Sequence, residues 1–230
     1  MADREEVRQR IIDATTELLR DKGRAGVTTR TVSAAAGVQA PTIYRLFTDM
    51  NGLLEAVAAD GFERYLARKD SRPFSDDPVA DWRRGWDTHV EFGLENPEQY
   101  LLMFGQTGSN IGREQALSRL RMIVERVAVA GRLAVGAETA MGMVHAACVG
   151  LTLNLIRTPP EERDLSLSGR LRDALLAAVT TDAPAGPPDV AQRAVGFKAV
   201  LGDAKELYTP GERALLEELL DRAANHAPDR

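Results

Sequence analysis

The stretch that decides the fold is residues 23–57, GRAGVTTRTVSAAAGVQAPTIYRLFTDMNGLLEAV. Thr28 is a good N-cap residue, so it predicts a short helix that runs to about Ala36. Gly37 then breaks this helix, and a second short helix follows from about Gln39 to Phe47. Two short helices joined by a tight glycine turn are the plan of a helix-turn-helix.

Apolar spacing predicts which faces of these two helices are buried. Val32 and Ala35 would give the first helix an apolar face, while Ile43 and Phe47, four residues apart, would face the core from the second. Pro41 fits the first turn of the second helix, where its missing N–H is no loss. Taken alone, the same signature also fits a corner between two helices of a plain bundle.

A helix that enters the major groove of DNA presents its N-terminal side chains to the base edges. A glutamine can pair with adenine, and the methyl group of a threonine can contact the methyl group of thymine. Tyr44 and Arg45 lie further along the helix and suit contacts with phosphates. Free N–H groups at the start of the Thr28 helix could also bind a phosphate. The residues expected at the bases are Gln39, Ala40, Pro41 and Thr42.

This stretch resembles the DNA-binding domain of the TetR (tetracycline repressor) family of bacterial regulators. That family has a threonine at a helix start, an Ala-Gly-Val turn, a recognition helix ending in Tyr-x-x-Phe, and a Leu-Leu pair in the next helix. Over about residues 8–57 the matching positions are Thr28, Ala36-Gly37-Val38, Tyr44, Phe47 and Leu53-Leu54. The resemblance implies DNA contacts from Thr28, Thr29, Arg30, Gln39, Pro41, Thr42, Tyr44 and Arg45.

The resemblance also implies a homodimeric repressor that binds a pseudo-palindromic operator and is released by a small-molecule effector. Two reading heads related by a two-fold axis would match two half-sites. One departure concerns the lysine with which the family usually starts its fourth helix. Met50 stands there, between Asp49 and Asn51, so we expect weaker DNA binding or a weaker dependence of binding on salt than the family norm.

Helical periodicity continues along nearly the whole chain, which predicts an all-α protein of about nine to eleven helices. The first helix should end at Lys22-Gly23, and later helices should begin at Asp77-Pro78, at Asn96-Pro97 and at Thr209-Pro210. Gln99 and Glu212 would complete capping boxes at the last two starts. We expect a helix-turn-helix domain at 1–52 and a larger helical domain for ligand binding and dimerisation at 53–230. The most linker-like stretch is 182–188, so 185–230 would be a C-terminal helical extension.

Two helical stripes are candidates for the effector pocket. Each mixes apolar bulk with one or two polar groups, as ligand sites do, although such stripes are more often simple core. A motif Pro-x-x-Tyr-x-x-Met-Phe, at Pro97, Tyr100, Met103 and Phe104, also resembles one TetR C-terminal subfamily. The pocket candidates are Trp82, Trp86, His89, Met103, Met141, His145 and Cys148.

A row of small residues predicts a close helix–helix contact. Gly142, Ala146 and Gly150 are spaced four apart, so they lie on one helix face and allow another backbone to approach. The partner could belong to the same chain or to a second subunit, and the resemblance favours the second subunit. The helix at about 165–180, with Leu171 and Leu175, would be the other part of this dimer interface.

Composition excludes several functions. The single cysteine, Cys148, rules out an internal disulfide framework, and three histidines give no complete metal site. No catalytic or nucleotide-binding motif is present, so we expect no enzyme activity, no catalytic residue and no cofactor. The charged N-terminus and the lack of an apolar run near 18 residues predict a cytoplasmic protein without a membrane partner.

The net charge of −5 at first opposes DNA binding, but the acidity is unevenly distributed. Residues 1–57 carry eight basic and eight acidic side chains, so residues 58–230 hold the whole excess. From Lys22 to Thr48 there are four basic side chains and no acidic one. The runner-up hypothesis is a helical small-molecule-binding or interaction protein that has lost effective DNA binding, which Met50 and the net acidity favour.

Overall fold

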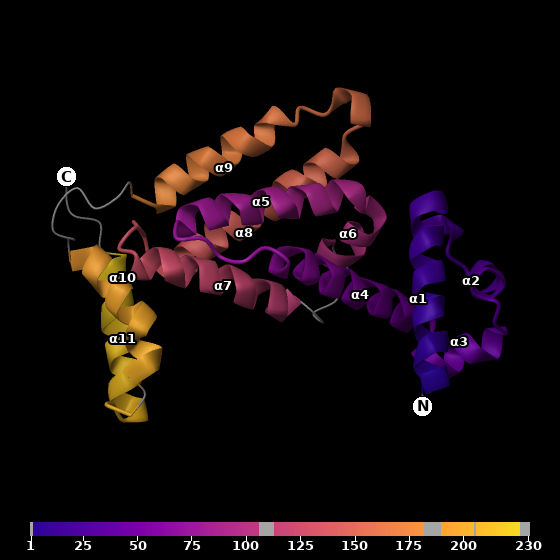
Figure 1. The fold of residues 1–230 in the computed structure, drawn as a ribbon, viewed down its shortest axis with the longest axis horizontal. Helices are drawn as coiled ribbons and strands as arrows, with labels where there is room; N and C mark the ends of the chain where they lie inside the picture. Colours follow the sequence, from indigo (N-terminus) through magenta and orange to yellow (C-terminus); the bar gives the residue numbers. More distant parts are fainter. Residues whose placement is uncertain (1, 106–112, 182–189, 205, 226–230) are drawn as a thin grey trace. The chain divides into compact units, whose positions relative to one another are not determined.

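The computed structural model describes residues 2–105, 113–181, 190–204 and 206–225. Within these ranges the chain forms eleven α-helices, and the only β-type pairing is an isolated bridge between Leu133 and Thr180. The predicted all-α class, with a helix-turn-helix domain followed by a larger helical region, is therefore confirmed. The helices (Figure 1) are α1 (Ala2–Lys22), α2 (Thr29–Ala36), α3 (Ala40–Phe47), α4 (Met50–Asp70), α5 (Pro78–Glu95), α6 (Pro97–Phe104), α7 (Arg113–Val129), α8 (Ala137–Arg157), α9 (Ser166–Val179), α10 (Val190–Val200) and α11 (Pro210–Ala224).

The chain divides into two compact units, each assembled from distant segments. Unit 1 holds Met1–Arg72, Thr88–Ala116 and Thr152–Arg163, and unit 2 holds the remainder. The domain boundary expected at residues 52 and 53 falls inside α4, and it stays a prediction. The linker expected at 182–188 lies outside the described residues.

The N-terminal part of unit 1 is a small helical domain with its own apolar core. α1 ends at Lys22, as predicted, and Gly23 follows with a φ of 63°. Ile11, Val32, Ile43 and Leu53 are fully buried in one cluster that joins α1 to α4. The prediction that Ala35 belongs to this face is wrong, because the buried alanine at the end of α2 is Ala36 and Ala35 is exposed.

The rest of unit 1 packs aromatic side chains from α4, α5 and α6. Phe62, Tyr65, Phe92 and Tyr100 are all buried in this second cluster. Gly93 of α5 allows the close approach, since a Cβ added there would lie 2.3 Å from Cγ2 of Thr152. This region is therefore packed so tightly that one extra methyl group would clash with its neighbours.

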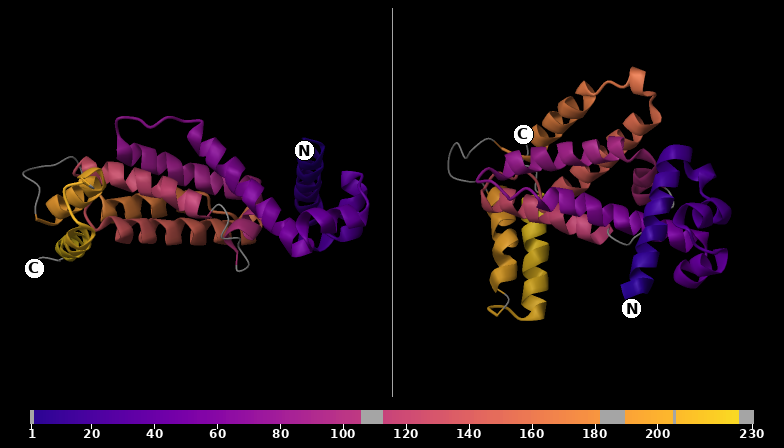
Figure 2. Two further views of the ribbon diagram at one scale, coloured as in Figure 1. Left: turned by 90° about the horizontal axis from the view of Figure 1, so that it is seen from below. Right: turned by 45° about the vertical axis from the view of Figure 1, so that its right-hand side comes forward.

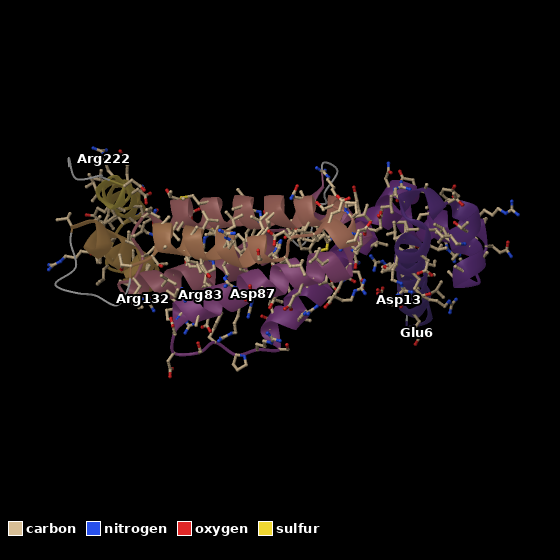
Figure 3. The ribbon with its side chains drawn as sticks, turned by 90° about the horizontal axis from the view of Figure 1, so that it is seen from above. Glu6, Asp13, Arg83, Asp87, Arg132 and Arg222 are labelled. Carbon is tan, nitrogen blue, oxygen red and sulfur yellow. The ribbon has the colours of Figure 1, made fainter. Side chains whose placement is uncertain are left out.

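Unit 2 contains α9, α10, α11 and the parts of α5, α7 and α8 that unit 1 does not include. α10 and α11 run side by side as a hairpin (Figure 2). Arg83 and Asp87, one turn apart on α5 (Figure 3), both make ion pairs with α9. These pairs reach Asp173 at 3.7 Å and Arg172 at 2.5 Å, respectively.

A buried carboxylate fixes the segment that precedes α5. Asp81 accepts hydrogen bonds from the Ser75 N–H and hydroxyl group and forms ion pairs with Arg84 and Arg126. Burial alone would raise the pKa of Asp81, but the hydrogen bonds from Ser75 and Arg126 outweigh it, so the pKa lies below its ordinary value.

The three predicted helix starts at Pro78, Pro97 and Pro210 are present, but one predicted cap is wrong. Asp77 caps α5 through the N–H groups of Val79 and Ala80, and Thr209 forms the expected capping box with Glu212. The capping box expected at Asn96 and Gln99 is wrong, because Asn96 makes no side-chain cap. Gln99 instead donates to the backbone oxygen of Val57 on α4, at 2.9 Å.

α8 revises the expectation about membrane segments. Its best 18-residue window has a mean hydropathy of 1.5, so by length and composition alone it could cross a membrane. Of that window 39% is buried inside the protein, and Ala140, Val144 and Leu155 are among its buried residues. A core helix of a helical protein has the same composition.

Candidate nucleic-acid interface

The start of α2 is held by a reciprocal capping box. The Thr31 N–H donates to Thr28 Oγ1 at 3.2 Å, and the Thr28 N–H donates to Thr31 Oγ1 at 2.9 Å. Thr31 Oγ1 also donates to the backbone oxygen of Gly26 at 2.7 Å. The first turn carries no acidic residue, so its positive end is not neutralised locally.

The turn between α2 and α3 depends on a glycine. Gly37 has φ 65° and ψ 37°, the left-handed conformation that other residues rarely adopt. The Val38 N–H closes the turn onto the Ser33 oxygen at 3.0 Å, and Arg10 of α1 donates to the Ala36 oxygen at 3.1 Å. The predicted glycine turn is therefore present and is tied to α1.

α3 is anchored from one face, which leaves the other face to solvent. Ile43 and Phe47 are buried, as predicted. Gln39 is the N-cap residue of α3, but its side chain makes no capping bond and is exposed. Tyr44 is 47% exposed, and its hydroxyl lies 3.1 Å from Thr29 Oγ1 on α2. This bond orients the phenol between the two helices.

A surface groove runs between α2 and α3. Four of the predicted DNA contacts, Thr29, Arg30, Gln39 and Ala40, line it. Sequence reasoning did not assign Ser33, Ala34, Gly37 or Val38 to this surface. Helical spacing could have found the first three, because positions three, four and seven after Arg30 share its face. The groove is lined by Thr29, Arg30, Ser33, Ala34, Gly37, Val38, Gln39 and Ala40.

The remaining predicted contacts flank this groove along the sequence. Thr28, Pro41 and Arg45 are exposed, and Thr42 is half-buried on α3. The predicted contacts therefore all lie on α2, on α3 or at their starts.

The start of α4 shows what replaces the missing lysine. Asp49 caps this helix, because its Oδ1 accepts from the Gly52 N–H at 2.8 Å. Its carboxylate therefore occupies the positive helix end that a phosphate could otherwise approach. Met50 packs half-buried against the N-terminal core and offers no charge.

A chain of polar contacts connects α1, α4 and α6 within unit 1. Gln9 of α1 donates to Asp60 Oδ1 at 3.0 Å, and Arg64 lies 2.8 Å from Asp60 Oδ2. Arg64 also donates to Gln99 Oε1 at 3.0 Å, and the amide of Gln99 reaches the Val57 oxygen. The last of these bonds is buried, so α6 is fixed to the middle of α4.

The seven candidate pocket residues are divided between the two units. His89 and Met103 belong to unit 1, while Trp82, Trp86, Met141, His145 and Cys148 belong to unit 2. His89 is buried between two phenols, with Tyr65 at 2.8 Å from Nδ1 and Tyr100 at 2.6 Å from Nε2. A neutral imidazole has one N–H, so one phenol donates to it and the other accepts.

The tryptophans differ in how their N–H groups are used. Trp86 donates to Ser168 Oγ at 3.0 Å. Trp82 is buried as deeply, yet its Nε1 finds no hydrogen-bond partner among the described residues. Met141 and His145 are half-buried, and Cys148 is buried and is not part of a disulfide. Whether these residues contact an effector stays a prediction.

The row of small residues on α8 is exposed along its length. Gly142, Ala146 and Gly150 all face solvent, and a Cβ added at either glycine would meet no atom within 4 Å. Leu171 and Leu175 of α9 are half-buried. Within the described ranges, no group of three or more His, Cys, Asp or Glu is arranged to hold a metal ion.

Comparison with known proteins agrees with this geometry. Residues 11–57 match the family model of bacterial regulatory proteins of the tetR family. No curated protein matches the chain.

Solved structures share the fold over most of the chain. A TetR-family transcriptional regulator from Pectobacterium atrosepticum aligns with a TM-score of 0.67 and 18% identity, covering 80% of this chain and 99% of that one. The complex of RolR with resorcinol aligns with a TM-score of 0.65 and 20% identity, covering 82% of this chain and 99% of RolR. The fatty acid degradation regulator FadR from Bacillus halodurans aligns with a TM-score of 0.62 and 17% identity, covering 74% of this chain and 94% of FadR. Residues 11–57 therefore match the DNA-binding domain of the tetR family, and the chain shares the fold of the solved structures with which it aligns.

Proposed function

We propose that this protein is a cytoplasmic, homodimeric repressor that binds a pseudo-palindromic operator and is released by a small-molecule effector. The observation that carries the proposal is the exposed face of α3. Gln39, Tyr44 and Arg45 are free to reach DNA, while Ile43 and Phe47 hold the helix from behind. This arrangement suits a helix that reads the major groove.

A dimer is supported by the unpartnered row on α8. Exposed glycine and alanine at four-residue spacing allow the backbone of a second α8 to approach closely, and Met143 beside them is 40% exposed. Two copies would double the number of phosphate contacts, which matters because each head carries few basic residues. The proposed dimer would therefore compensate for Met50.

Release by an effector is supported by the contacts that join α6 to α4. Gln99 fixes α6 to Val57, and the Asp60–Arg64 pair continues to Gln9 of α1. A ligand that favours another position of α6 would shift α1 and the recognition helix with it. Because RolR was solved with resorcinol, small aromatic diols are reasonable first compounds to test.

The runner-up is a helical ligand-binding protein without effective DNA binding. The specific observation in its favour is that Asp49 places a carboxylate at the start of α4, next to Met50, which stands where the family usually carries a lysine.

A gel mobility shift with DNA from around the protein's own gene separates the two proposals. The repressor should retard a palindromic fragment in a salt-sensitive manner. A confirmed dimer that causes no retardation at low salt would refute the repressor and support the runner-up.

A further inference from the structure

A cavity of about 100 Å³ lies in unit 2, between α7, the start of α8 and the C-terminal hairpin α10–α11. By this measure a water molecule needs about 10–15 Å³, so the cavity has room for a molecule of roughly seven to ten heavy atoms. Val124, Met141 and Val195 contribute apolar walls. No proposed DNA contact lines this cavity, and of the seven candidate effector residues it includes Met141 alone, so the site differs from those considered above.

Charged groups also line the cavity, and most of them are already paired. Arg121 lies 3.3 Å from Glu138, and Lys198 forms an ion pair with Asp221 across the hairpin. Each pair leaves no net charge behind. Both cations of the lining are therefore already engaged with carboxylates.

Glu125 is the exception among these groups. It lies half-buried on α7 and lines the cavity. It makes no hydrogen bond or ion pair to any part of the chain that the structure describes. The cavity thus presents three carboxylates against two cations, and one of the three has no partner. A partly desolvated carboxylate of this kind gains from a cation that can donate hydrogen bonds to it.

We propose that this cavity binds a small organic cation, a primary amine with a short apolar body, whose ammonium group pairs with Glu125. The apolar walls would contact the body of the amine, and the charge would be compensated by the carboxylate. Because one wall belongs to α10 and α11, the bound amine would hold the C-terminal hairpin against α7 and α8. An anion is disfavoured because Glu138 already occupies the first turn of α8.

Isothermal titration calorimetry of the full-length protein with n-hexylamine tests the proposal, with n-hexanol as the neutral analogue and hexanoate as the anion. A hydrogen bond to a charged group contributes enough that hexylamine should bind about ten-fold more tightly than hexanol. Glu125→Gln should remove this advantage and leave hexanol binding unchanged. Glu138→Gln is the matched control, and it should keep most of the advantage because that carboxylate is exposed and paired.

Methyl NMR of the methionines locates the binding. On addition of hexylamine the Met141 methyl signal should shift, whereas that of Met143, exposed on the same helix, should not. Equal binding of amine and alcohol, tighter binding of hexanoate, no detectable binding, or an unchanged Glu125→Gln variant would each overturn the proposal. A shift at Met143 without one at Met141 would do the same. An unaltered circular dichroism spectrum and melting curve would verify that the Glu125→Gln variant is folded.

Discussion

Replacing Gly37 by alanine tests whether the helix-turn-helix geometry depends on a left-handed turn. Gly37 has a φ of 65°, and a Cβ added there would meet no atom within 4 Å. The cost of the substitution is therefore purely one of backbone conformation. For alanine a left-handed residue costs about 1–2 kcal/mol, while the lower entropy of the unfolded chain returns about 0.4–1 kcal/mol. We expect Gly37→Ala to lower the free energy of unfolding by roughly 0–1.5 kcal/mol.

Gly211→Ala provides the matched control for this change. Gly211 lies in the first turn of α11, does not have a positive φ, and its added Cβ would also meet nothing within 4 Å. The same substitution there should raise the free energy of unfolding by about 0.4–1 kcal/mol. The two variants should thus differ by about 1–2 kcal/mol, which is the conformational cost itself.

Urea unfolding followed by circular dichroism, at one protein concentration for all variants, measures this difference. Gly37→Asn should fall between Gly37→Ala and the wild type, because asparagine tolerates the left-handed region better. If Gly37→Ala stabilised the protein as much as Gly211→Ala, the turn would not have the geometry described. The Asn variant separates backbone strain from any effect of losing the glycine as such.

Three further changes test other parts of the account. Because the folded pKa of Asp81 is lowered, its interactions stabilise the protein above the unfolded pKa of about 3.9 and are lost as the pH falls below that value. Asp81→Asn should therefore destabilise the protein at neutral pH and make its free energy of unfolding less dependent on pH below about pH 4. Urea unfolding at several pH values measures this dependence, and a dependence equal to that of the wild type would count against the buried pairing. Gly93→Ala places a Cβ 2.3 Å from Thr152. The variant should be less stable than the wild type, because an overpacking cost of about 1–3 kcal/mol should outweigh a helix-propensity gain of about 1 kcal/mol. A higher melting temperature would contradict the packing. Ala146→Glu should yield monomers in light scattering, whereas Ala67→Glu, on an exposed position of α4, should leave the dimer intact. A dimeric Ala146→Glu variant would exclude that row from the interface.

The N-terminal domain was predictable because its determinants are local. Thr28, Gly37 and the pair Ile43 and Phe47 act over a few residues, through capping, backbone conformation and helical spacing. Local effects of this kind can be predicted directly from a single sequence. The capping box expected at the start of α6 was predicted incorrectly for the opposite reason. The Gln99 side chain is drawn to Val57, 42 residues away, and no local rule anticipates that bond.

Surfaces built from distant segments could not be predicted from the sequence either. The candidate amine site needs α7, α8, α10 and α11 together, and only then does the lack of a partner for Glu125 become visible. Periodicity placed Trp82 and Trp86 on one helical stripe, yet it could not tell that Ser168 accepts a hydrogen bond from the indole N–H of Trp86. Hydropathy alone could not distinguish whether α8 is a core helix or a membrane helix, because α8 is long and apolar enough for either.

Whether α3 reads DNA is tested most directly by measuring operator affinity against salt concentration for the wild type and for Arg45→Ala, by fluorescence anisotropy. If Arg45 contacts a phosphate in each half-site, the slope of log affinity on log salt should fall by about two for the dimer, and affinity should fall for all sequences. Arg222→Ala, an exposed change on α11 (Figure 3), should leave both unchanged. Wild-type affinity and slope in a dimeric Arg45→Ala variant would contradict the placement of the recognition helix.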